Sequence, residues 1–218
     1  MTEKKSPIAL IFAIAAVTFM VGAFASPYWV ESFSKSENRF VKAGLWEFCF
    51  NDYTFWKDYN GKRYLGCWYI FSNQYRPIWE WLSPPWFIVC QVMVSVCLLF
   101  HVIATFILIL MILNLIPQYL KEVVLMGIGF VYLFVVLFGL IEMILFGVKK
   151  EDRGWMPRPD QNYLSWGYGL FVICIIFTLI SALLLLMAGR NVRNELKEDY
   201  PHKNYYSWTL NFTSKYMM

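Results

Sequence analysis

The sequence predicts an integral membrane protein: a bundle of four transmembrane helices that carries a small extracellular antiparallel β-sheet. Hydrophobic residues make up 59% of the chain and charged residues only 16%, whereas a soluble domain has about 45–50% and about 25%. Four long apolar segments occur, and the polar segment between the first two is rich in aromatic residues. This composition excludes disordered, collagen-like and soluble cytosolic proteins.

Each apolar segment is long enough to cross a bilayer, because a hydrocarbon core of about 30 Å needs about 20 residues of helix. The helices are expected at residues 8–26, 86–116, 123–148 and 168–188. The first exceeds the apolar core of a cleaved signal peptide, about 7–15 residues, so we expect an uncleaved helix. Within it, Thr18, Gly22 and Ser26 recur every four residues and predict a face for close helix contact.

An even number of helices places both termini on one side of the membrane and the first and third connections on the other. Four basic residues lie directly at the membrane ends of the terminal segments: Lys4, Lys5, Arg190 and Arg193. Basic residues favour the cytosolic side, so we expect a cytosolic N-terminus and a cytosolic tail over residues 189–218. Residues 27–85 and 149–167 are then the extracellular loops.

The cysteines fall into two groups. Cys90, Cys97 and Cys174 lie within the expected spans, where they act as small apolar side chains. Cys49 and Cys67 are the two in the polar loop, and an isolated pair there is typical of an extracellular disulfide; two free cytosolic thiols are the alternative. No metal site is expected, because two cysteines without a nearby histidine provide too few ligands.

The first loop has the composition of β-strands over residues 39–72, with many Phe, Trp, Tyr and Val residues. Asn60-Gly61 predicts a two-residue hairpin turn. Around that turn Thr54 would face Cys67, which argues against a Cys49–Cys67 pair in the same two-strand ladder. Either Cys49 lies on an earlier strand beside the strand of Cys67, or the Asn-Gly turn belongs to a looser loop.

A recognisable order of residues follows the first helix: Trp29, then Gly44, Leu45 and Trp46, then Cys49 and Cys67. This order resembles the first extracellular segment of the claudin superfamily, which also includes peripheral-myelin and epithelial-membrane proteins and channel γ subunits. The four-span layout with a long first loop is similar as well. The resemblance implies that Trp46 anchors the sheet against the outer helix ends and that the Cys49–Cys67 disulfide fixes strand pairing.

The sequence also departs from vertebrate claudins. The two loop cysteines are more widely spaced, and the chain ends in Tyr216-Met217-Met218 rather than in the Tyr-Val terminus that engages PDZ scaffolds. The pattern is similar to that of a divergent invertebrate claudin-like member, such as those of insect septate junctions.

The resemblance implies a structural protein of cell–cell junctions in the lateral plasma membrane. There it would contribute to a tight- or septate-junction-like paracellular barrier, through association of extracellular sheets in cis and in trans. Its expected partners are the lipid bilayer, further copies of itself and related four-span junction proteins. The alternative is an auxiliary, γ-like subunit that modulates an ion channel or receptor.

Two polar residues within the spans are candidate functional groups, because ionisable side chains are costly in a membrane. Glu142 lies in the third span and His101 in the second; structural packing roles are the alternative. A transporter that uses both residues is a further class, but the chain lacks inverted repeats. In the second loop, Trp155-Met156-Pro157 either offers an adhesive contact or belongs to a solvated connector.

Enzymatic and nucleic-acid functions are not expected. The chain has two histidines and lacks the zinc-protease, nucleophile-elbow and phosphate-loop motifs. Its 19 basic and 15 acidic residues form no basic stripe for nucleic acid. We expect no catalytic residues and no cofactor.

Overall fold

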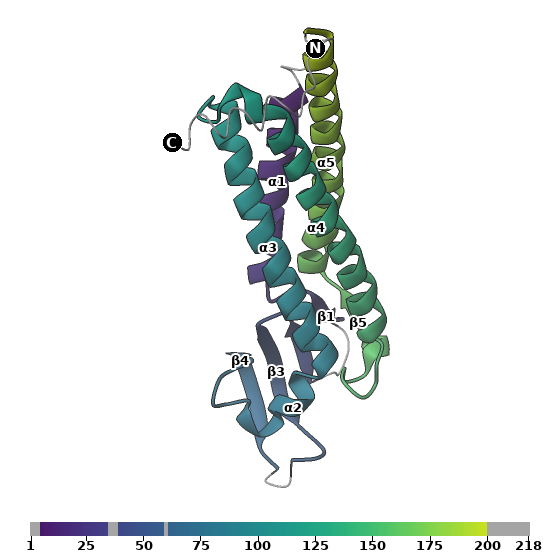
Figure 1. Ribbon diagram of the computed structural model, residues 1–218. Coiled ribbons are helices and arrows are strands. Elements are labelled where there is room, and N and C mark those ends of the chain that lie inside the picture. Colours follow the sequence, from purple (N-terminus) through teal and green to yellow (C-terminus); the bar gives the residue numbers. More distant parts are fainter. Residues whose placement is uncertain (1–4, 35–38, 59–60, 200–218) are drawn as a thin grey trace.

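The computed structural model describes residues 5–34, 39–58 and 61–199. Long helices form a bundle, and a five-stranded antiparallel sheet lies at one end of it (Figure 1). The start of the first helix and the end of the last lie at the opposite end of the bundle from the sheet. The predicted fold class, a four-helix membrane bundle with a small antiparallel sheet, is confirmed.

The four membrane-length helices are α1 (Lys5–Ala25), α3 (Pro85–Ile112), α4 (Lys121–Lys149) and α5 (Trp166–Asp199). Each contains a window that is apolar enough to cross a membrane. Helix α3 ends before the expected residue 116, because Asn114 has a left-handed backbone (φ 57°) and Pro117 follows. Helix α5 continues past the expected residue 188, and the rest of the expected tail lies outside the described residues.

The extension of α5 is held by an ion pair. The Arg193 guanidinium donates to the Glu122 carboxylate at 2.5 Å, and Glu122 is buried at the start of α4. A buried carboxylate is costly without a partner. The pair therefore ties the polar end of α5 to α4 beyond the apolar segment.

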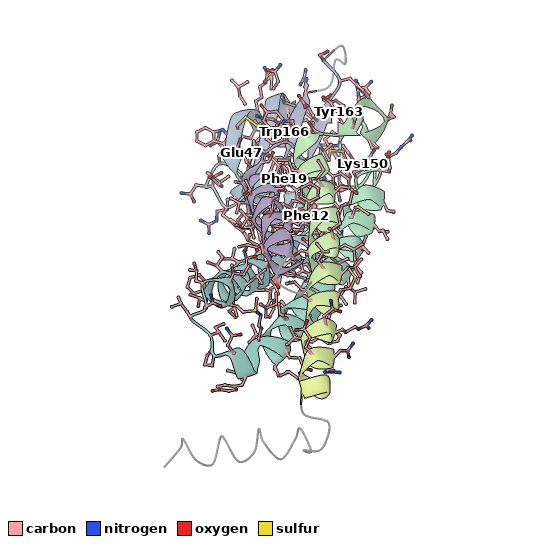
Figure 2. All side chains as sticks on the ribbon, turned by 90° about the horizontal axis from the view of Figure 1, so that it is seen from above. Phe12, Phe19, Glu47, Lys150, Tyr163 and Trp166 are labelled. Atoms are coloured by element: carbon pink, nitrogen blue, oxygen red, sulfur yellow. A yellow bond between two sulfur atoms is a disulfide. The ribbon has the colours of Figure 1, made fainter. Side chains whose placement is uncertain are left out.

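The helices close a ring in which α5 packs on α1 and α4, and α3 packs on α4 and α1. Helix α1 contributes a fully buried alanine stripe: Ala9, Ala13, Ala16 and Ala23. Beside this stripe, Phe12 and Phe19 project from α1 and contact the Phe177 ring at 5.5 and 5.6 Å between centroids (Figure 2). The predicted small-residue face is only partly correct, since Gly22 meets Leu170 but Thr18 is exposed.

The sheet has the strand order β4-β3-β2-β1-β5. Its strands are β1 (Val30–Ser32), β2 (Phe40–Ala43), β3 (Glu47–Thr54), β4 (Arg63–Tyr69) and β5 (Asn162–Leu164). The last strand comes from the second loop and pairs with β1. Both loops therefore contribute to one sheet.

The hairpin register differs from the prediction. Cys49 lies directly opposite Cys67 in the β3–β4 ladder, so the exclusion of such a pair is wrong, and the alternative of a connection looser than a two-residue turn is correct. Strand β3 ends at Thr54 and β4 begins at Arg63, so a two-residue turn does not join them; Gly61 has φ 57°, and Asn60 lies outside the described residues. In addition, β3 has one extra residue between Phe50 and Tyr53, where Asp52 has φ 54°. Such a bulge shifts the ladder by one position.

Short helices connect the larger elements: η2 (Arg76–Ile78), α2 (Trp79–Leu82), η3 (Gln118–Leu120) and η4 (Pro159–Gln161). An aromatic layer joins the sheet to the bundle. The Trp29 ring lies 4.9 Å from Phe146 and 5.4 Å from Phe171, while Phe48 of β3 meets Phe87 of α3 at 5.9 Å. These rings are almost completely buried, so the sheet packs firmly on the helix ends.

Candidate functional site

Trp29 links the end of α1 to the sheet. Its indole Nε1 donates to the Ala23 carbonyl at 2.7 Å, and its side chain is fully buried. A helix end leaves carbonyl groups without intrahelical partners, and this bond satisfies one of them. Trp29 thus fixes the direction in which the chain leaves the membrane-length helix.

Gly44 and Leu45 pack closely against the chain that follows α1 and against α3. A Cβ atom at Gly44 would lie 2.3 Å from the Ser26 carbonyl oxygen and 2.6 Å from the Pro27 Cα. Beside it, the Leu45 side chain is buried and its carbonyl accepts a hydrogen bond from Gln91 Nε2 of α3 at 2.6 Å. Only glycine leaves room for this backbone contact.

Trp46 packs at the sheet–helix boundary. Its ring lies 5.1 Å from Phe24 at the end of α1 and 6.4 Å from Phe71. Its Nε1 is buried and has no hydrogen-bond partner among the described residues. The contact with Phe24 places Trp46 where an anchor for the sheet would act.

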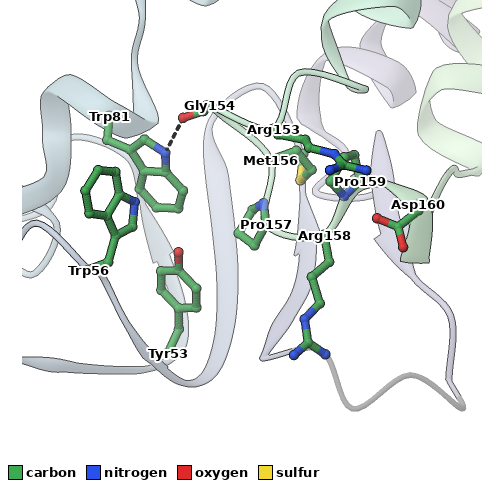
Figure 3. A pocket seen from close by; sticks show the side chains of 10 residues that line it. All are labelled: Tyr53, Trp56, Trp81, Arg153, Gly154, Met156, Pro157, Arg158, Pro159 and Asp160. Atoms are coloured by element: carbon green, nitrogen blue, oxygen red, sulfur yellow. Dashed lines mark hydrogen bonds between the residues drawn. The ribbon is translucent and has the colours of Figure 1, made fainter.

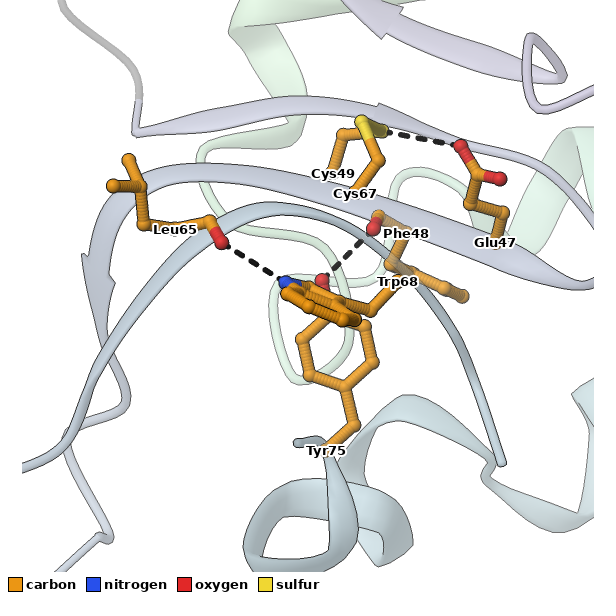
Figure 4. Close-up of a disulfide and its surroundings, with 7 residues drawn as sticks. All are labelled: Glu47, Phe48, Cys49, Leu65, Cys67, Trp68 and Tyr75. Carbon is orange, nitrogen blue, oxygen red and sulfur yellow. Dashed lines mark hydrogen bonds between the residues drawn. A yellow bond between two sulfur atoms is a disulfide. The ribbon is translucent and has the colours of Figure 1, made fainter. Parts of the chain in front are cut away.

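Cys49 and Cys67 form a disulfide that crosses the β3–β4 hairpin (Figure 4). The Glu47 carboxylate lies beside the sulfur atoms, but both sulfurs are used in the bond and are not free to bind a metal. Below the ladder, the Tyr75 hydroxyl donates to the Phe48 carbonyl at 2.8 Å. The hairpin is therefore fixed by a covalent bond and by a buried hydrogen bond.

Two buried tyrosines support this hairpin. The Tyr64 hydroxyl lies 3.1 Å from the Asp58 carboxylate, and burial together with that hydrogen bond raises the pKa of Tyr64. Burial, with a smaller contribution from the charge of Glu47, also raises the pKa of Tyr75. Both phenols are therefore held in the neutral form well above their ordinary titration range.

Strand β4 forms one edge of the sheet and exposes large apolar side chains. Leu65 is 63% exposed, Tyr69 66% and Phe71, directly after the strand, 65%. We refer to Leu65, Trp68, Tyr69 and Phe71 as the β4 patch; it lies along the edge of the sheet, with Trp68 and Tyr69 on opposite faces of the strand. Unpaired backbone groups of an edge strand offer hydrogen bonds to another strand, and exposed apolar clusters typically mark interaction sites.

Glu142 and His101 do not form a joint site. Glu142 is buried at the depth of Cys90, near the sheet end of the bundle. His101 instead packs edge-on against Tyr132, with 4.9 Å between ring centroids. Glu142 lies ten positions after Tyr132 in α4, which corresponds to about 15 Å along the helix axis. Since His101 packs at the level of Tyr132, His101 and Glu142 lie at different depths of the bundle. Within the described part of the chain, neither ring nitrogen of His101 has a hydrogen-bond partner, whereas Glu142 interacts with the neighbouring Cys90 thiol.

The second loop does not expose the tryptophan that suggested an adhesive contact. Trp155 and Met156 are buried, and the Trp155 Nε1 donates to the Leu82 carbonyl at 3.2 Å. The Trp155 ring also contacts Trp86 at 4.7 Å. These residues attach the loop to the bundle, and the exposed residues of this part of the loop are 151–154, Arg158 and Asp160.

Sequence reasoning missed three features of the site. Gln91 is the one buried side-chain amide of α3, and it donates a hydrogen bond to the Leu45 carbonyl. A single amide in an otherwise apolar helix was the sequence feature that could have indicated this bond. The pairing of β5 with β1 and the pocket between the two loops (Figure 3) gave no local signal.

These features define a four-span membrane protein whose two loops on one side build a single disulfide-bonded sheet. A family model described as PMP-22/EMP/MP20/claudin tight junction matches residues 13–187, which is most of the chain. The chain belongs to this family. No curated protein matches it closely enough to be counted as a relative.

Proposed function

We propose that this protein is a structural component of cell–cell junctions that contributes to a paracellular barrier by association of its extracellular sheets. The single observation that carries the proposal is the β4 patch, an apolar surface on a free sheet edge. Membership of the claudin family supports a junctional role in general.

The orientation proposed for this role places the sheet outside the cell. Arg190 and Arg193 lie at the end of α5 opposite the sheet, and basic residues at membrane ends favour the cytosolic side. The disulfide in the sheet is consistent with an oxidising, extracellular environment. Copies in one membrane could then meet edge to edge, while copies in the opposing membrane meet through the loops.

The β4 patch offers two kinds of interaction with a further copy. Its free edge can add a strand through main-chain hydrogen bonds. Its exposed side chains can bury apolar area, which is worth about 25 cal/mol per Å². The disulfide and the bulge keep the edge in one shape, so little ordering is needed on association.

Localisation of a tagged protein in mixed epithelial cells tests the proposal. Enrichment is expected where two expressing cells meet and not where an expressing cell meets a non-expressing one. Leu65→Arg should reduce that enrichment roughly tenfold, because a charge would be buried in the apolar contact. Asn51→Arg, at an exposed position on β3, is the matched control and should retain it.

Two outcomes would contradict the proposal. A uniform surface distribution of the wild-type protein would favour the auxiliary channel-subunit alternative, which co-purification with a channel would then support. Equal enrichment of wild type and Leu65→Arg would show that the β4 patch is not the contact surface.

A further inference from the structure

A pocket of about 360 Å³ lies between the β3–β4 hairpin and the second loop (Figure 3). This volume falls within the usual range for small-molecule sites, about 300–1,000 Å³. Its two walls come from segments about a hundred residues apart in sequence. The junctional role proposed above is argued from the β4 patch and not from this pocket.

One wall is aromatic. Tyr53 and Trp81 stack with 5.6 Å between centroids and an interplanar angle of 11°, and Trp56 stands beside them with 78% of its surface exposed. Burial raises the pKa of Tyr53, so its hydroxyl remains a neutral hydrogen-bonding group. The wall therefore offers ring faces together with an indole N–H and a hydroxyl.

The opposite wall carries charge. Arg153, Arg158 and Asp160 line it, and none of the three takes part in an ion pair with another described residue. Two cations against one anion leave a net positive site. Guanidinium groups bind carboxylates through paired hydrogen bonds, whereas the Asp160 carboxylate can accept hydrogen bonds from hydroxyl groups.

The two walls of the pocket are connected to each other before any ligand binds. Trp81 Nε1 donates to the Gly154 carbonyl at 3.0 Å, which joins the two walls directly. Arg158 has a left-handed backbone (φ 45°, ψ 65°) although a proline follows it, a conformation disfavoured for a residue in that position. Strained backbone of this kind persists where the surrounding structure enforces it and is concentrated at binding sites.

We propose that this pocket binds an acidic monosaccharide unit, a hydroxyl-bearing ring with one carboxylate. Arg153 and Arg158 hold the carboxylate, Asp160 accepts hydrogen bonds from ring hydroxyls, and the C–H face of the ring lies on the aromatic wall. An acidic peptide or a phosphate group fits less well, because Asp160 would repel it without a hydroxyl to bond. Both walls lie on the side proposed to be extracellular, where acidic sugars occur.

Ligand-observed NMR on the full chain in lipid nanodiscs tests the site with three probes: methyl β-glucuronide, methyl β-glucoside and benzoate. The glucuronide should bind roughly tenfold more tightly than the glucoside, because only the glucuronide has a carboxylate for the arginines. It should also bind more tightly than benzoate, which lacks hydroxyls. Saturation transfer should be strongest at the ring C–H protons.

Variants identify the residues involved. Arg158→Gly and Arg153→Gln should each weaken glucuronide binding roughly tenfold, while Arg76→Gln, an exposed arginine outside the pocket, should leave it unchanged. Arg158→Gly also removes the backbone strain, so the midpoint of thermal unfolding should not fall. Weaker binding in a variant that is no less stable separates recognition from a structural role.

Four outcomes would overturn the assignment. These are equal affinity for glucuronide and glucoside, tighter binding of benzoate than of glucuronide, loss of binding in Arg76→Gln equal to that in the pocket variants, and absence of binding at about 10 mM glucuronide. Each outcome leaves the junctional proposal untouched, because cell-contact enrichment is measured separately.

Discussion

The contact of Gly44 with the backbone that follows α1 allows a direct test of how the sheet packs against the helix bundle. In Gly44→Ala, the new Cβ would lie 2.3 Å from the Ser26 carbonyl oxygen and 2.6 Å from the Pro27 Cα. Both are backbone atoms, so the strain cannot be relieved by a side-chain rotation. Overpacking in a rigid site costs typically about 1–3 kcal/mol, and we expect the upper end, about 3 kcal/mol.

For a chain of this length, about 3 kcal/mol corresponds to a decrease of roughly 6–12 °C in the unfolding midpoint. The protein carries its own reporter, because Cys90, Cys97 and Cys174 are free and buried. Heating in detergent with a thiol-reactive fluorophore should therefore show the transition as those thiols become accessible. The disulfide-bonded cysteines do not react.

Gly127→Ala is the matched control. The same methyl group is added on α4, where nothing lies within 4 Å of the new Cβ. A helical alanine is favoured over glycine by about 0.5–1 kcal/mol, so the midpoint should rise by a few degrees. If Gly44→Ala unfolds at the wild-type temperature, or if both substitutions shift the midpoint in the same direction, the steric reasoning is refuted.

Three further predictions follow from the hairpin and its supports. Replacing Cys49 and Cys67 together by Ser should destabilise the protein by roughly 3 kcal/mol through the unfolded-state entropy, measured as a lower thermal midpoint; reductant should lower the midpoint of the wild type but not that of the variant. Gln91→Leu leaves the buried Leu45 carbonyl without its donor and should cost about 1–3 kcal/mol; an unchanged thermal midpoint would contradict this. The pKa values of Tyr64 and Tyr75 are raised in the folded protein. Their contribution to stability is therefore fully present below a pH of about 10 and is lost as the pH rises above that value. The double variant Tyr64→Phe and Tyr75→Phe should show a shallower fall in thermal midpoint between neutral and strongly alkaline pH.

The helices were predictable from sequence because bilayer thickness fixes their length. An apolar run of about 20 residues has few alternatives to a transmembrane helix. The limits of α3 and α5 were less predictable, since one depends on the left-handed Asn114 and the other on an ion pair between Arg193 and Glu122. Both are contacts or conformations that hydrophobicity does not encode.

The sheet shows where local reasoning is insufficient. Strand composition and the loop cysteines indicated an antiparallel sheet, but one extra residue beside Asp52 displaced the ladder that the Asn-Gly signal predicts. The burial of Trp155 depends on α2 and α3, which are distant in sequence. The pocket is likewise lined by residues of both loops, so the sequence of either loop alone does not predict it.

The pairing of β5 with β1 has a consequence for biosynthesis. Strand β1 ends at Ser32 and β5 begins at Asn162, so β2, β3, β4, α3 and α4 all lie between them in the sequence. The Ser165 hydroxyl nevertheless donates to the Glu31 carboxylate across 134 positions. The ribosome therefore completes the β3–β4 hairpin, with both of its cysteines, before α3 is made, whereas β1 waits for its outer neighbour until α4 has emerged. A chain stopped after α3 would present β1 as a second open edge, which chaperones or quality-control factors could recognise as unfinished.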